Sequence, residues 1–164
     1  MSLDRDSGVI LETPSAAPPS AAPVMPSPPT LSEEEQILAQ YRRFFASSTT
    51  LSTLPAAERP ALLREIATDP QYTRTLDGLA AADAAGEINY GGQGGVSPRV
   101  ANIGLATAVV QDCQDGSQTG RARKSDGTKL TVGLPAELAV TQMRRGPDGI
   151  WRVAEVIYPP DRTC

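Results

Sequence analysis

The chain has 164 residues and a formal net charge of −4, with 15 lysines and arginines against 19 aspartates and glutamates. This balance leaves no basic surface of the size that nucleic acid requires, so we expect no nucleic-acid partner. The chain has no histidine, which removes the usual general base and the commonest metal ligand; we predict no metal and no cofactor. No apolar run approaches the roughly 18 residues that span a membrane.

The first 30 residues differ in composition from the rest of the chain. Seven of the fifteen prolines fall there, among alanines and serines, with few large apolar side chains after Leu11. Such a segment cannot bury enough surface to offset the entropy of ordering, so residues 1–30 are predicted to be a disordered tether. Tethers of this kind commonly follow a cleaved signal or a membrane anchor. We therefore expect an exported protein whose N-terminal anchor is missing here, with residues 31–164 as one folded domain.

The domain is predicted to begin with a helix over residues 36–48. Ser32 as N-cap and Glu35 form a capping box ahead of it. Tyr41 and Phe45 share the apolar face of this helix. We interpret that face as one packed on a sheet, and the alternative is that Tyr41 and Phe45 line a ligand cavity.

Two more helices are predicted before the pattern changes. A short one over 61–66 follows Pro60, which suits a first helical turn. A longer one begins at Asp69-Pro70 and carries an apolar stripe to about residue 85, where Gly86 is a natural stop. Residues 49–53 between the first two helices are predicted to be a polar loop.

From residue 87 the apolar period changes to two, which predicts strands. The glycine-rich residues 91–95 lack the lysine and the following helix of a phosphate loop, so we interpret them as a strand connection. Residues 115–128 are predicted to be a polar loop, and a Pro-Asp-Gly turn at 147–149 joins the last two strands. Helices followed by antiparallel strands predict an α+β fold with helices on one face of a curved sheet. The predicted strands are 87–91, 99–105, 106–113, 129–132, 137–143 and 150–158.

Cys113 and Cys164 are the only cysteines. In an exported chain such a pair most simply forms a disulfide, which would join the C-terminal segment to a central strand. Free thiols in a cytosolic protein are the alternative.

Asp112 and Glu155 are the acids to weigh as acid–base groups. Alternation along the last strand predicts that Glu155 shares the apolar face of Trp151 and interrupts its stripe. A carboxylate placed there could have a raised pKa. The interpretation we prefer is a structural one, in which Glu155 pairs with an arginine such as Arg99 or Arg144.

Several stretches resemble the NTF2-like (cystatin-like, SnoaL-like) superfamily. These are residues 98–100, residues 107–113 with their terminal Asp-Cys, the Asp-Gly-Ile-Trp-Arg-Val run at 148–153, and the helix over 36–48. The chain looks most similar to small bacterial exported or lipid-anchored members. The resemblance implies a cone in which two to three N-terminal helices pack on a curved antiparallel sheet of four to five strands, often with a cavity between them.

Some members of that superfamily are enzymes that use His and Asp in the cavity, and this chain has no histidine to carry those roles. Others are non-catalytic modules of cell-envelope machines. We therefore expect a non-catalytic, extracytoplasmic binding or accessory module of the bacterial cell envelope, which binds an envelope protein or a small apolar ligand near Tyr41, Phe45, Trp151 and Glu155. Two alternatives stay open. One is a SnoaL-type enzyme that uses carboxylates such as Glu155 or Asp112, and the other is a conjugation- or secretion-type scaffold, which would form a homodimer.

Overall fold

The computed structural model describes residues 30–92, 97–161 and 164. The predicted tether lies outside these residues except for Thr30, and so does most of the glycine-rich segment 91–95. Residues Leu31–Cys164 form a single unit by their contacts. Within the part that is described, no helix has the length and apolar character needed to cross a membrane.

Helix α1 (Glu33–Ala46) begins at the predicted capping box. The Ser32 hydroxyl accepts a hydrogen bond from the Glu35 N–H at 3.2 Å, and the Glu35 carboxylate accepts one from the Ser32 N–H at 2.7 Å. The Ser32 N–H and the Ser32 hydroxyl both donate to the Glu35 carboxylate, and these two bonds hold the pKa of Glu35 below its ordinary value, since they favour the charged carboxylate. The helix buries Ile37 and Tyr41 completely against the sheet.

Three further helices complete this half of the domain: α2 (Ser48–Thr53), α3 (Arg59–Ile66) and α4 (Gln71–Ala85). The prediction of a polar loop at 49–53 is wrong. The hydroxyls of Ser52 and Thr53 donate to carbonyls three or four residues earlier, so side chains that favour loops instead support a helical turn. Helix α4 ends as predicted at Gly86, whose φ of 70° is a left-handed conformation that glycine adopts without strain.

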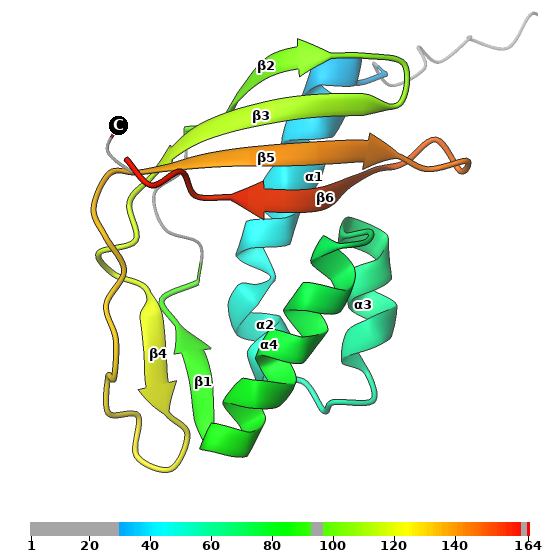
Figure 1. Cartoon of the computed structure of the whole chain (residues 1–164). Helices are drawn as coiled ribbons and strands as arrows, with labels where there is room; N and C mark the ends of the chain where they lie inside the picture. The colour runs from blue at the N-terminus through cyan, green and yellow to red at the C-terminus, as the bar shows by residue number, and fades with distance from the viewer. Residues whose placement is uncertain (1–29, 93–96, 162–163) are drawn as a thin grey trace, which may run out of the picture. The chain divides into compact units, whose positions relative to one another are not determined.

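The main sheet has four antiparallel strands in the order β2-β3-β5-β6. Helix α1 lies across one face of it (Figure 1). The predicted hairpin at 147–149 is present, and the Gly146 N–H donates to the Ile150 carbonyl at 2.9 Å across it. The strands are β2 (Arg99–Ile103), β3 (Thr107–Gln114), β5 (Glu137–Arg145) and β6 (Trp151–Ile157).

A second, two-stranded sheet pairs β1 (Glu87–Tyr90) with β4 (Gly120–Arg123). Strand β4 falls inside the predicted polar loop 115–128, so that prediction is wrong over four residues. Its single apolar residue, Ala122, is buried, and one buried alanine among charged residues gives no visible alternation in the sequence.

Residues 129–132, predicted to be a strand, run beside β4 without forming one, apart from an isolated bridge between Ala122 and Lys129. The Leu130 N–H does donate to the Arg121 carbonyl at 2.7 Å. However, the Thr131 side-chain oxygen accepts the Arg121 N–H at 2.9 Å, which replaces the carbonyl that a regular ladder would use.

A β-bulge in β6 changes which side chains face the core. Gln142 pairs with Glu155 and Met143 pairs with Val153, so Ala154 is an extra residue between them. The prediction that Glu155 shares the face of Trp151 is therefore wrong. Before the bulge, Trp151 and Val153 are buried. After the bulge, Val156 and not Glu155 packs against the core.

The core has two clusters. One lies between α1 and the sheet, and the other among α2, α3 and α4. Phe44 packs against both clusters and so joins the sheet layer to the helices. The first cluster consists of Ile37, Tyr41, Ala108, Val110, Met143, Trp151 and Val153, and the second of Leu51, Leu63, Ile66, Ala67 and Leu79.

Candidate functional site

Two adjoining hollows lie where α1 and α2 meet the β1–β4 sheet and the end of β3. The polar hollow has a volume of about 270 Å³, and the apolar hollow has a volume of about 250 Å³. Both are lined by Phe45, Ser48, Asn89 and Tyr158. The polar hollow adds Tyr90, Gln114, Asp115 and Arg121, whereas the apolar hollow adds Phe44, Leu51 and Leu79.

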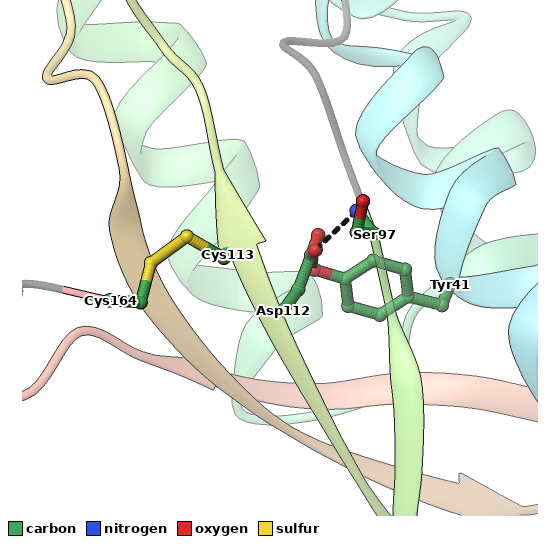
Figure 2. The surroundings of a disulfide bond; sticks show 5 residues. All are labelled: Tyr41, Ser97, Asp112, Cys113 and Cys164. Atoms are coloured by element: carbon green, nitrogen blue, oxygen red, sulfur yellow. Dashed lines mark hydrogen bonds between the residues drawn. A yellow bond between two sulfur atoms is a disulfide. The ribbon is translucent and has the colours of Figure 1, made fainter.

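A chain of hydrogen bonds leads from the polar hollow into the core. The Tyr158 hydroxyl donates to Gln114 Oε1 at 3.1 Å, and Gln114 Nε2 donates to Tyr41 Oη at 2.8 Å. The Tyr41 hydroxyl then donates to Asp112 Oδ2 at 2.7 Å. The remaining oxygen, Asp112 Oδ1, accepts the Ser97 N–H at 2.6 Å (Figure 2). The series of hydrogen bonds thus runs without a break from Tyr158 at the hollow to the buried carboxylate of Asp112.

Asp112 is the buried end of this chain, with 2% of its surface exposed. Burial and the neighbouring Asp112 raise the pKa of Tyr41 far above its ordinary value, so Tyr41 keeps the proton that it donates. Both carboxylate oxygens of Asp112 are occupied by fixed donors, and Asp112 does not line either hollow. In this arrangement Asp112 holds α1 and the segment before β2 against β3.

The neighbouring residue on β3 carries the disulfide. Cys113 and Cys164 are bonded, with their Cα atoms 5.8 Å apart and 51 positions between them in the chain. Figure 2 shows the two strand neighbours pointing apart, with Asp112 toward Tyr41 and Cys113 toward Cys164, as strand alternation requires. The disulfide predicted from the sequence is present, and it fastens the chain beyond Tyr158 to the sheet.

The four residues predicted to surround a cavity do not share one. Phe45 lines both hollows. The Tyr41 ring packs against the Phe45 ring, with 4.7 Å between the ring centroids, but Tyr41 is fully buried and lines neither hollow. Trp151 lies on a different hollow, between α1 and the β5–β6 hairpin. Glu155 forms an ion pair at 3.2 Å with Arg74 of α4, not with either of the two arginines suggested above.

Most residues that line the two hollows were not predicted from the sequence. Asn89 and Tyr90 belong to a strand of four residues, and Gln114 and Tyr158 lie at or just beyond strand ends. The pairing of β1 with β4 is what brings them to one place, and β4 gave no signal of its own. For the residues that the structure covers, no group of three or more histidine, cysteine, aspartate or glutamate side chains could hold a metal ion.

Comparison with known proteins bears on the fold. The sequence matches no protein-family model and no curated protein. The structure resembles the intermembrane-space region of the chloroplast protein ARC6, with a TM-score of 0.53 at 11% identity over 79% of this chain and 98% of that one. It also resembles an NTF2-like superfamily protein from Salmonella enterica, with a TM-score of 0.52 at 11% identity over 80% of this chain and 91% of that one.

The fold is thus the α+β, NTF2-like cone that the sequence motifs suggested, with helices packed against a curved, four-stranded antiparallel sheet. It has one short helix, α2, beyond the two or three that were predicted. At these identities the likeness defines the class of fold and no activity.

Proposed function

We propose that this domain is a non-catalytic binding module of the bacterial cell envelope, and that it binds a small ligand with an apolar body and a polar end in the two hollows. The observation that carries the proposal is the state of Asp112. This buried carboxylate is the natural candidate for acid–base chemistry, yet both its oxygens are held by the protein and it does not line a hollow. A general base must reach the proton that it abstracts.

The other acids support the same proposal. Glu155 forms an ion pair with Arg74 and lines neither of the two hollows. Asp115 does line the polar hollow, but its carboxylate accepts the Ser117 N–H at 2.9 Å. The hydrogen bonds from Ser117 lower the pKa of Asp115, which makes it a weaker base at neutral pH. Neither Asp112 nor Glu155, the carboxylates that the enzyme alternative would use, is therefore positioned to exchange a proton with a ligand in these hollows.

The chemistry of the two hollows suggests the ligand class. Phe44, Leu51 and Leu79 offer an apolar wall on one side. On the other side, Asn89 and Tyr158 lie at the boundary with the polar hollow, where amide and hydroxyl groups can bind a ligand oxygen. A small alcohol or phenol with a hydrocarbon body fits both sides.

The disulfide supports the proposed location outside the cytoplasm, because such bonds persist in oxidising compartments. Thiol labelling in the native cell tests it. If the protein is extracytoplasmic, Cys113 and Cys164 should resist a maleimide reagent until a reductant is added. Labelling of both thiols in untreated cells would contradict the proposal.

Ligand binding is tested by protein-observed NMR with a set of small alkylphenols and alcohols. Ser48 lines both hollows, so Ser48→Phe should fill them and abolish saturable shifts. Thr50→Phe is the matched control, because Thr50 is exposed on the same short helix and lines neither hollow. Equal binding by the two variants, or shifts confined to another face, would contradict the assignment of the site.

A further inference from the structure

A third hollow, the arginine hollow, lies between α3, the start of α4 and the β5–β6 hairpin. Its volume is about 570 Å³, which is larger than either hollow of the site proposed above, and it shares no lining residue with them. Four arginines line it, against one acid: Arg64, Arg144, Arg145 and Arg152, with Asp69. The chain as a whole has a net charge of −4, so this local excess of positive charge runs against its composition.

Two of the four arginines are held by ion pairs within the protein. The terminal nitrogens of Arg152 donate to the two carboxylate oxygens of Asp148 at 3.0 and 2.7 Å, and its Nε donates to the Arg64 carbonyl at 2.7 Å. Arg145 forms an ion pair with Glu33 at 3.2 Å. These two arginines are therefore fixed parts of the wall.

The other two arginines have no acidic partner. Among the residues that the structure describes, neither Arg64 nor Arg144 forms an ion pair. The Arg64 guanidinium lies over the ring of Tyr72, 5.4 Å from its centroid. The Arg144 side chain donates only to the Asp69 carbonyl, at 3.5 Å, which is long for a hydrogen bond. Both residues are exposed, so a ligand in the hollow can reach them.

The position of Arg144 is unfavourable without a ligand. The register of β5 and β6 places it directly opposite Arg152, and like charges in such a cross-strand pair are destabilising. Asp148 forms its ion pair with Arg152 and not with Arg144. The carboxylate of Asp69 accepts hydrogen bonds from the N–H and hydroxyl of Thr73, at 3.3 and 2.6 Å. A bound anion would therefore offset a repulsion that the described residues leave uncompensated.

We propose that the arginine hollow binds the phosphate group of an organic phosphate monoester through Arg64 and Arg144. Such a group carries a charge of about −1.5 to −2 at pH 7 and three acceptor oxygens, so it can accept from both guanidinium groups. A carboxylate has two oxygens, which a single guanidinium fork can occupy. Ala67, Tyr72 and Pro147 also line the hollow and offer less polar surface to the organic part of the ligand.

The test is a titration of the disulfide-bonded protein with glycerol 3-phosphate, followed in ¹H–¹⁵N spectra. We expect saturable shifts of the amide signals of Thr68 and Gly146, two residues that line the hollow. Glycerate, which carries a carboxylate on a three-carbon body, should bind at least about tenfold more weakly, the effect of one charge-assisted hydrogen bond.

Vesicles identify the source of the phosphate. Phosphatidylcholine vesicles are compared with and without phosphatidic acid, which carries the same phosphate monoester on a lipid. Binding of glycerol 3-phosphate without binding to either vesicle would assign a soluble ligand. Binding that requires phosphatidic acid would assign a lipid headgroup.

Variants locate the binding site. Arg64→Gln and Arg144→Gln should each weaken binding of the probe by about tenfold or more. Arg42→Gln is the matched control, because it removes the same charge from an exposed position on α1 that does not line the hollow. It should weaken binding by less than about twofold, since solvent and salt screen exposed charges. The proposal is overturned if neither phosphate probe binds, if glycerate binds as tightly as glycerol 3-phosphate, or if Arg42→Gln weakens binding as much as the other two variants.

Discussion

Replacing Tyr41 by phenylalanine would remove one oxygen atom from the middle of the buried hydrogen-bond chain. Asp112 Oδ2 would lose the donor that now lies 2.7 Å away, and Gln114 Nε2 would lose its acceptor at 2.8 Å. A hydrogen bond to a charged group contributes about 1.5–3 kcal/mol, and the phenylalanine ring leaves the carboxylate buried without that partner. We therefore expect Tyr41→Phe to lower the free energy of unfolding by about 2–3 kcal/mol.

Urea unfolding followed by the fluorescence of Trp151, which is buried in the same core cluster, measures this loss as a lower midpoint at an unchanged slope. Tyr90→Phe is the matched control, because the Tyr90 hydroxyl donates to the Thr131 carbonyl near the surface. It should cost less than about 0.5 kcal/mol. If Tyr41→Phe costs as little as this control, the account of Asp112 as a fixed structural group is refuted.

Three further outcomes are expected. Because the pKa of Tyr41 is raised in the folded protein, its contribution to stability is fully present below about pH 10, where an unfolded tyrosine titrates. Above that pH, the free energy of unfolding should fall more steeply in the wild type than in Tyr41→Phe. Equal slopes for the two proteins above about pH 10 would count against this. Replacing Cys113 and Cys164 by serine should cost up to about 4 kcal/mol in urea unfolding, because the disulfide closes a long loop, and no change in midpoint would be inconsistent with that role. The hydrogen bond from the Arg152 side chain lowers the pKa of Asp148 to about 2. The wild type should therefore be more stable than Asp148→Asn above about pH 4, and this difference should vanish as the pH falls toward 2. A difference that stays constant over this range would be evidence against the Arg152–Asp148 pair.

Features with a local cause were predicted well from the sequence. The capping box at Ser32, the stop at Gly86 and the turn before Ile150 each depend on residues within a few positions, so the pattern and the structure coincide there. The disulfide between Cys113 and Cys164 followed from there being only two cysteines. Together with the motif resemblance, these features were enough to indicate the cone.

Features with a distant cause were missed. Tyr41 and Asp112 are 71 positions apart, and Arg74 and Glu155 are 81 positions apart, so no local pattern signals either contact. The bulge at Ala154 shifts strand alternation by one residue, and that shift moved Glu155 away from the face assigned to it. The candidate site depended on such contacts, which is why only Phe45 of its predicted residues lines it.

The central claim is that the two hollows bind a ligand and perform no chemistry on it. Its most direct test is a time course by ligand-observed proton NMR, in which the disulfide-bonded protein is incubated with the alkylphenol and alcohol set. The account predicts line broadening that disappears in Ser48→Phe, with every compound recovered unchanged. Conversion of any compound at a rate that falls in Asp112→Asn or Glu155→Gln would contradict it.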